Sequence, residues 1–265
     1  MDLRGESNLT SIIIAVYNQL AYTKQCWEAI RKHTSLPFEL IIVDNASADG
    51  TADFLKGIDA FVIVNDENQG CSVAWNQGIR ASHGNYVVIM NNDVLVTPDW
   101  LKALIHFMEK MEHGIVSPSV REGNSNYDLI TYSRNFTKLC RSASRSQVLG
   151  CCMLIRRSVF NKIGLFDEQF FVGHEDIDFI WRCKQAGFTV GMTGSAFVHH
   201  FGEVTQKQIK IGGRSDYGRS NAEKFFKKWG MSDKGTRVEQ LLNKLRKNYW
   251  SMTEMLRYGH TLIEK

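Results

Sequence analysis

The stretch YVVIMNNDVLVTPDW, residues 86–100, decides the fold, because a strand that reads as buried ends there in two amides and a carboxylate. The strand-favouring residues 86–90 lead directly into Asn91, Asn92 and Asp93, and a second short apolar run follows. Ordinary turns also favour Asn and Asp. One junction of this kind leaves two interpretations open, a simple turn or one wall of a binding site, and the other strands must decide between them.

The first half of the chain alternates apolar runs with helix-like segments. The other strands that it predicts are residues 11–16, 38–43, 60–64 and 114–117. Their near-continuous Val and Ile content is typical of parallel strands covered on both faces. After residues 86–96, the sequence predicts a helix with Thr97 as its N-cap and Pro98 at its first helical position. The alternation predicts an α/β protein with a doubly wound, mostly parallel sheet.

The second half is less regular. Residues 119–146 are polar, rich in Ser, Asn and Arg, and show no clear periodicity, which predicts a long surface loop. A strand-like segment, helices and further strands are predicted over residues 147–199. After residue 228, apolar side chains repeat at helical spacing in a basic tail. That pattern predicts an amphipathic helix packed on the body or on a partner, with a membrane surface as the alternative.

These patterns predict one large domain and an appendage. The domain covers residues 1–230, with a nucleotide-binding half at about 10–118 and an acceptor half at about 119–230, and a helical C-terminal appendage covers 231–265. The chain has 265 residues, which is long enough for this arrangement.

Composition excludes several classes of protein. The chain is 43% hydrophobic and 23% charged with a net charge of +4, and no basic stripe with interleaved aromatic residues suggests a nucleic-acid partner. Its six cysteines show neither a CxxC pair nor regular spacing, so we expect reduced thiols rather than disulfides or a zinc site. No signal peptide or membrane-spanning run is evident. The predicted location is the cytoplasm, with work at the inner face of the membrane left open.

Polar residues follow each of the first four predicted strands. They are Tyr17-Asn18, DNASADGT (44–51), NDENQG (65–70) and Asn91-Asn92-Asp93. Ligands of open α/β sheets bind beyond the carboxyl ends of the strands. Four such ends weaken the turn interpretation and predict one polar crevice. No GxGxxG follows the first strand and no P-loop motif is present, so carboxylates at a phosphate site indicate a bridging Mg²⁺ or Mn²⁺.

Five blocks of the sequence resemble, in order and spacing, the inverting family-2 glycosyltransferases with a GT-A fold. They are SIIIAVYNQ, IIVDNASADGT, NQGCSVAWNQGI, VIMNNDV and GHEDIDFIWR, and the resemblance covers about residues 10–205. In type, the chain is similar to rhamnosyltransferase-like members that act in polysaccharide biosynthesis. The resemblance implies the nucleotide-diphospho-sugar transferase fold, a GT-A-like α/β sheet, here followed by the helical appendage.

The resemblance also implies roles for the residues at the strand ends. Asp93 would bind the metal, Asn91 and Asn92 would lie near the sugar or ribose, and Asp44 would bind the pyrimidine base with Asn45 beside it. The other implied nucleotide contacts are Ala15, Tyr17, Asn18, Asn68 and Asn76. For Asn76, a simple surface amide on a helix is the alternative.

The block Gly173–Asp178 carries the candidate base. Asp178 lies four residues before Arg182, a favourable helical pair, with Glu175 on the same side, whereas Asp176 has no obvious partner. The alternative is a purely structural role, because acidic residues stabilise the first turn of a helix. The family resemblance implies that Asp176 is the general base, with Glu175 beside it in the catalytic site.

Two further candidates follow the last predicted strand. His199 and His200 are adjacent, and the resemblance implies that one of them reaches the metal without deciding which. Gly212-Gly213-Arg214 is a candidate lid over the diphosphate.

The sequence thus predicts an enzyme that transfers a sugar from a UDP- or dTDP-linked donor to an acceptor hydroxyl with inversion, assisted by Mn²⁺ or Mg²⁺. A carbohydrate, a lipid-linked glycan and a protein all remain open as acceptors, as do a homodimer through the C-terminal helix and peripheral membrane association. Two alternatives remain. One is a catalytically degenerate binding or scaffold protein of the same fold, and the other is a sugar nucleotidyltransferase, which would need a Gly-rich phosphate loop after the first strand.

Overall fold

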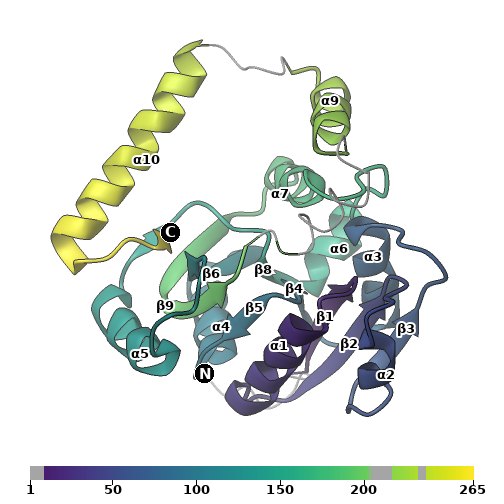
Figure 1. The fold of residues 1–265 in the computed structure, drawn as a ribbon. Coiled ribbons are helices and arrows are strands. Elements are labelled where there is room, and N and C mark those ends of the chain that lie inside the picture. Colours follow the sequence, from purple (N-terminus) through teal and green to yellow (C-terminus); the bar gives the residue numbers. More distant parts are fainter. Residues whose placement is uncertain (1–8, 203, 205–216, 232–236) are drawn as a thin grey trace.

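The parallel half of the sheet follows the predicted order. The computed structural model describes residues 9–202, 204, 217–231 and 237–265. Its first elements are β1 (Thr10–Val16), α1 (Leu20–His33), β2 (Phe38–Asp44), α2 (Thr51–Leu55), β3 (Phe61–Val64), α3 (Cys71–Ala81) and β4 (Tyr86–Asn91). Strands β3, β2, β1 and β4 lie side by side and parallel (Figure 1). Each of these strands matches its predicted range to within one residue, and their carboxyl ends share one edge of the sheet.

The second half completes one mixed sheet. Its elements are β5 (Val94–Val96), α4 (Trp100–Met111), β6 (Ile115–Glu122), α5 (Leu129–Cys140), β7 (Ser144–Arg145), β8 (Cys152–Arg156), α6 (Arg157–Ile163), α7 (Glu175–Gln185), β9 (Val190–His200), α9 (Tyr217–Trp229), α10 (Arg237–Tyr258) and β10 (Ile263–Glu264). The strand order is β3-β2-β1-β4-β8-β6-β9-β5. Strand β8 runs antiparallel to β4 and β6, and β5 runs antiparallel to β9.

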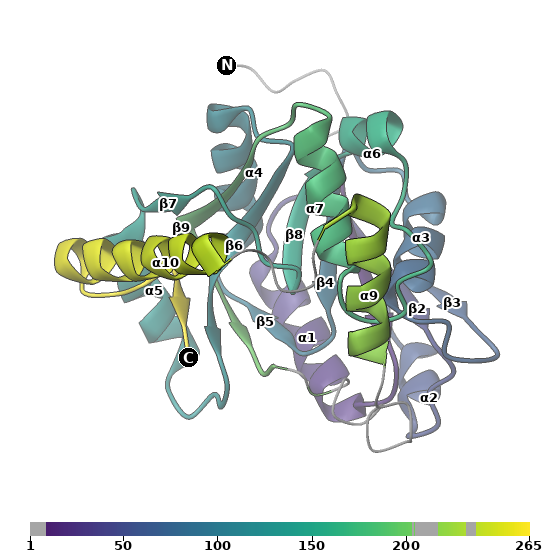
Figure 2. The same cartoon turned by 90° about the horizontal axis from the view of Figure 1, so that it is seen from above.

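Helices cover both faces of the sheet, because successive side chains of each strand point to opposite faces. Ile12 and Ile14 of β1 pack with residues of α1, α2 and α4, whereas Ile13 packs with residues of α3, α6 and α7. Figure 2 shows α3, α6 and α7 on one side of the sheet and α4 on the other. Burying a side chain of this size contributes roughly 1.5–3 kcal/mol. The doubly wound, mostly parallel α/β fold is therefore confirmed.

The predicted loop over residues 119–146 is wrong. Strand β6 continues to Glu122, and α5 and β7 fill most of the remainder. Asp128 caps α5 by accepting hydrogen bonds from the N–H groups of Ile130 and Thr131. The helix buries Ser133, Phe136 and Cys140. Because a serine occupies one buried position, the apolar stripe is too weak to read in the sequence.

The predicted start of α4 is also wrong. The helix begins at Trp100 with Asp99 as N-cap. The hydroxyl of Thr97 donates instead to the carbonyl of Phe197 on β9, at 2.6 Å. Thr97 thus joins the segment after β5 to the neighbouring strand rather than capping the helix.

The C-terminal tail forms the expected long helix and then returns to the sheet. Strand β10 pairs with β6, so the last residues belong to the sheet that carries the site. The division at residue 230 stays a prediction. No helix among the described residues is long and apolar enough to cross a bilayer.

Candidate active site

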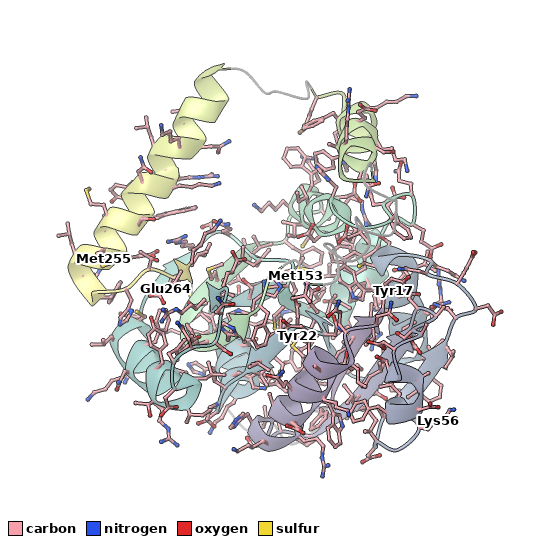
Figure 3. The ribbon with its side chains drawn as sticks, in the orientation of Figure 1. Tyr17, Tyr22, Lys56, Met153, Met255 and Glu264 are labelled. Atoms are coloured by element: carbon pink, nitrogen blue, oxygen red, sulfur yellow. The ribbon has the colours of Figure 1, made fainter. Side chains whose placement is uncertain are left out.

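A cleft of about 750 Å³, open to solvent, lies at the carboxyl ends of β1, β2 and β4. Nine of the residues singled out in the sequence line this cleft: Ala15, Tyr17, Asn45, Asn68, Asn91, Asn92, Asp93, Glu175 and His200. Figure 3 labels Tyr17 at the end of β1. The structure therefore brings together residues from all four polar strand ends, as expected for a ligand site in an open α/β sheet.

The turn after β4 places Asp93 beside His200. The N–H of Asn91 donates to the carbonyl of Cys151 at 3.0 Å, and the amide of Asn92 donates to the hydroxyl of Thr23 at 3.0 Å. Strand β5 starts directly after Asp93 and pairs with β9 in a register that aligns Val94 with His200. The buried Asp93 carboxylate consequently lies 3.3 Å from Nε2 of His200.

The two histidines point to different places. His200 lies between Asp93 and Glu122, and the Oε1 of Glu122 is 3.6 Å from Nδ1 of His200. His199 is fully buried, and its Nδ1 is 3.0 Å from the hydroxyl of Tyr127. The sequence left the choice open, and the geometry favours His200 as the partner of Asp93.

The environments of the histidines also differ electrostatically. Burial and the neighbouring His200 lower the pKa of His199 to about 4. For His200, burial opposes protonation, but Asp93 and Glu122 outweigh it and raise the pKa to about 9. A cation bound here would have to displace the His200 proton.

The donor set around Asp93 fits a cation that shares its ligands with a substrate. Among the described residues, no group of three or more His, Cys, Asp or Glu side chains is arranged to hold a metal. Asp93 and His200 therefore offer two ligands, and no Lys or Arg is among the described residues that line the cleft. Mg²⁺ and Mn²⁺ sites of this kind take their remaining ligands from water and phosphate oxygens.

The opposite wall is the first turn of α7. It follows two residues with positive φ, Gly173 at 90° and His174 at 74°. Glu175 lines the cleft and is 6% exposed, and its buried Oε2 has no hydrogen-bond partner among the residues that the structure describes. Burial and the neighbouring Asp176 raise the pKa of Glu175 to about 8. A carboxyl group with this environment is a candidate functional group.

Asp176 follows Glu175 on α7 and is half-buried, and it is not among the described residues that line the cleft. Burial raises its pKa, and its Oδ1 accepts a hydrogen bond from the N–H of Ile177 at 2.8 Å. A Cβ atom on Gly150 would lie 2.1 Å from its Oδ2, so the Gly150 backbone packs directly against the carboxylate. Among the described residues, Asp176 forms no ion pair with Lys or Arg.

Asp178 has a structural role. It is fully buried, and its carboxylate lies 2.8 Å from Nε of Arg182 and 2.7 Å from Nζ of Lys228. The indole N–H of Trp229 also donates to it at 3.0 Å. The predicted contrast between a paired Asp178 and an Asp176 without such a partner is therefore present in the structure.

Three carboxylates influence the pKa of one thiol in the cleft wall. Burial, followed by the charges of Glu175, Asp176 and Asp93, raises the pKa of Cys71. Cys71 also connects the walls, since its N–H donates to the carbonyl of Phe171 at 2.8 Å. The preceding Gly70 has a φ of 86°, and a Cβ there would lie 2.4 Å from the same carbonyl. The loop after β3 can approach α7 this closely because residue 70 is glycine.

Several predicted nucleotide contacts instead hold the strand-end loops in place. The Oδ1 of Asn18 accepts from the N–H of Ala48 at 2.7 Å, and the amide of Asn45 donates to the carbonyl of Gly70 at 3.2 Å. The Oδ1 of Asn68 accepts from the N–H of Gly70 at 3.0 Å. Asn45 and Asn68 still line the cleft, whereas Asn18 does not.

Asp44 is buried below the cleft. Its Oδ1 accepts from the N–H of Ser47 at 3.0 Å, and its Oδ2 is buried without a partner. It is not part of the cleft wall. Its predicted contact with a base stays a prediction.

Asn76 is bonded within the protein. Its amide donates to the carbonyl of Phe166 at 2.9 Å and to Glu168 at 2.8 Å, and it accepts from the N–H of Phe166 at 3.0 Å. Asn76 is buried, so the surface-amide alternative is wrong, and its nucleotide contact stays a prediction. It fastens α3 to the segment before α7. Gly212, Gly213 and Arg214 lie outside the described residues.

Sequence reasoning missed six wall residues. They are Val16, Gly70, Cys71, Trp75, Val172 and Val204. Most are apolar and carry no chemical signature in the sequence. Trp75 differs, because its indole N–H is buried without a hydrogen-bond partner.

Comparison with known proteins agrees with this geometry. Residues 11–164, more than half of the chain, match the model of glycosyl transferase family 2. The chain belongs to this family. An uncharacterized glycosyltransferase of Rickettsia typhi is 31% identical over 182 residues, which are 64% of this chain and 57% of the relative. The low-salt glycan biosynthesis hexosyltransferase Agl10 of Haloferax volcanii is 28% identical over 217 residues, 76% of this chain and 69% of the relative.

Solved glycosyltransferases share the fold at low sequence identity. The mannosyltransferase PcManGT from Pyrobaculum calidifontis, in complex with GDP-Man and Mn²⁺, has a TM-score of 0.56 at 19% identity, over 72% of this chain and 56% of its own. TarS of S. aureus in complex with UDP has a TM-score of 0.57 at 17% identity, over 72% of this chain and 60% of its own. The fold is therefore GT-A-like. The chain spans only 30% and 57% of the first two curated relatives that it matches.

Proposed function

We propose that this glycosyltransferase moves one sugar from a UDP- or dTDP-linked donor to an acceptor hydroxyl, with inversion at the anomeric carbon. The observation that carries the proposal is that Asp93 and Glu175 line opposite walls of one cleft of a GT-A-like fold, with Asp176 next to Glu175 at the start of α7. A cleft lined by carboxylates, with no Lys or Arg among its described wall residues, needs a cation to hold a diphosphate.

Asp93 and His200 would hold that cation. The Mn²⁺ that accompanies GDP-Man in the structure of the Pyrobaculum mannosyltransferase supports this proposal. When bound, the cation would neutralise the diphosphate and act as a Lewis acid on the leaving group. Asp93 and His200 fix its position, because Asn92 fastens the turn to Thr23 and β5 fastens it to β9.

Asp176 is the proposed general base. It takes the proton from the acceptor hydroxyl while the acceptor oxygen forms a bond to the anomeric carbon. The bond between that carbon and the diphosphate oxygen breaks, and the diphosphate leaves with the electron pair. A raised pKa suits this task, because a base works best when its pKa lies near the working pH. Gly150 lets the backbone pack against the carboxylate and hold its direction.

Glu175 and Trp75 are proposed contacts of the donor sugar. Both line the cleft, and each has a buried polar atom without a partner, Oε2 and Nε1 respectively. Hydroxyl groups of a sugar can accept from the indole N–H and exchange a hydrogen bond with the carboxyl group. The name of the Haloferax relative, which refers to glycan biosynthesis, supports a carbohydrate acceptor.

Calorimetric titration with UDP and dTDP, with and without Mn²⁺, tests the donor site. We expect one nucleotide to bind more tightly with Mn²⁺, and Asp93→Ala to remove the gain. If the nucleotide affinity is the same with and without Mn²⁺, Asp93 and His200 do not have their proposed roles. If neither nucleotide binds, the transferase proposal fails and a scaffold function remains.

A further inference from the structure

Helix α10 presents an apolar stripe to solvent. The six side chains in it are each more than half exposed: Leu242, Leu245, Tyr249, Met252, Met255 and Leu256. Five of them follow one another at intervals of three and four residues, which places them on one side of a helix. Figure 3 labels Met255 on this helix. Scattered exposed hydrophobic residues are normal, but a continuous stripe of this length marks an interaction surface.

The opposite side of α10 is fixed to the body. Glu254 is buried, and its oxygens lie 2.7 and 2.6 Å from Nε and Nη2 of Arg145. The N–H of Leu262 donates to the same carboxylate at 2.9 Å, and Arg145 lies 5.3 Å from the centre of the Trp250 ring. At 100° per residue, Trp250 and Glu254 lie roughly opposite the apolar stripe. The docking contacts therefore turn the stripe away from the protein, and in Figure 1 the helix extends away from the sheet.

Charge indicates what covers the stripe. Over residues 242–258 the exposed charged residues are Lys244, Arg246, Lys247 and Arg257, and the one acidic residue is the buried Glu254. Arg246 and Arg257 follow one side of the stripe and Lys244 follows the other. A second copy of the same helix would bring these like charges together, which disfavours self-pairing. An anionic surface would instead attract them.

We propose that α10 lies in the plane of an anionic lipid surface. Its apolar stripe would enter the boundary between headgroups and acyl chains, and its Lys and Arg residues would contact anionic headgroups. The helix is anchored by Glu254 and Arg145, so docking would need no unfolding of the chain. Neither α10 nor its basic residues line the cleft, and the proposal is therefore independent of the proposed transfer reaction.

Co-sedimentation of the full chain with vesicles tests this proposal. The vesicles are phosphatidylcholine alone or phosphatidylcholine mixed with phosphatidylglycerol. We expect binding to the mixed vesicles only, weakened by added salt. Removing the three charges beside the stripe in Lys244→Gln/Arg246→Gln/Arg257→Gln should weaken binding about 100-fold, at about fivefold per charge. Leu245→Ser/Met252→Ser should abolish it.

Helix α5 offers a matched control. Leu139 is 51% exposed, close to the 54% of Leu245, and the exposed Lys138 precedes it. The pair Lys138→Gln/Leu139→Ser should leave vesicle binding unchanged, and thermal unfolding checks that every variant folds. Equal binding to both vesicle types, or equal loss in the control, would overturn the proposal. So would absence of vesicle binding, in which case sedimentation equilibrium would show whether Leu245→Ser/Met252→Ser breaks a dimer.

Discussion

Acidic residues lie at two places beside the same cleft, and their charges are balanced in different ways. Asp93, after β4, has His200 at 3.3 Å. Glu175 and Asp176, at the start of α7, have no Lys or Arg ion pair among the described residues, and burial raises the pKa of both. A carboxylate beside a cation keeps its negative charge, whereas one that is only buried tends to keep a proton. The difference suits the first cluster to hold a metal and the second to move a proton.

The largest effect should come from removing the base. Asp176→Asn keeps the shape of the side chain but cannot accept the acceptor proton, so transfer should fall by a factor of roughly 10²–10⁴. Nucleotide affinity should stay unchanged, because Asp176 does not line the cleft. Initial transfer rates and calorimetric titration measure the two quantities.

Asp178→Asn provides the contrast on the same helix. It would disrupt a buried carboxylate with three partners, and the folded state should lose on the order of 3 kcal/mol. Asp176→Asn should unfold at nearly the native temperature. If Asp176→Asn transfers sugar at the native rate, another group is the base.

Gly150 tests whether the position of the base matters. In Gly150→Ala the new methyl group would meet Oδ2 of Asp176 at 2.1 Å, so the carboxylate must move. A displacement of about 1 Å can cost 10²-fold in rate. We expect kcat to fall by up to that factor with little change in donor KM. Gly123→Ala is a control on an open loop, since no atom lies within 4 Å of a Cβ there, although its φ of 108° makes some strain unavoidable. A fall in donor affinity instead would mean that Gly150 shapes the donor site.

The proposed metal site is tested by comparing variants of the two histidines. His200→Gln should weaken the Mn²⁺-dependent gain in nucleotide affinity by about 10–100-fold, a loss typical of disturbed metal shells. His199→Gln should leave the gain nearly unchanged, because its Nδ1 faces Tyr127. Titration of both variants at a fixed Mn²⁺ concentration makes the comparison. Equal losses would show that the effect is structural and not specific to His200.

The sequence predicted the parallel strands well, because their Val and Ile runs and polar ends are local signals. Asp93 was also singled out this way, since it directly follows a strand, whereas Glu175 was placed in the site only by the resemblance to a family. Helix α5 was missed because Ser133 occupies a buried position. The burial of Asn76 was not predicted because its partners, Phe166 and Glu168, lie about ninety residues away in the sequence. The choice between His199 and His200 likewise depends on the pairing of β5 with β9, which local patterns do not encode.

The last effect concerns the stability cost of Glu175. Burial and Asp176 raise its pKa from 4.5 to about 8. Between these values the folded state holds a proton that the unfolded state has released, so the free energy of unfolding falls as the pH rises. Glu175→Gln removes this loss because the amide is neutral at every pH. The melting temperature of this variant should therefore exceed that of the native chain at pH 8 and approach it at pH 5. Each kcal/mol gained in the free energy of unfolding should raise the melting temperature by about 2–4 °C.

Glu28→Gln, an exposed change on α1, should leave the pH dependence of the melting temperature as it is. A native pH dependence in Glu175→Gln would mean that the Glu175 carboxyl group is not protonated in the folded chain. A stabilised variant that has lost transfer would have a different meaning. It would show that the chain keeps a destabilising buried carboxyl group for its chemistry, as expected where activity and stability conflict. Asp93 should show no such gain on neutralisation, because His200 already balances its charge.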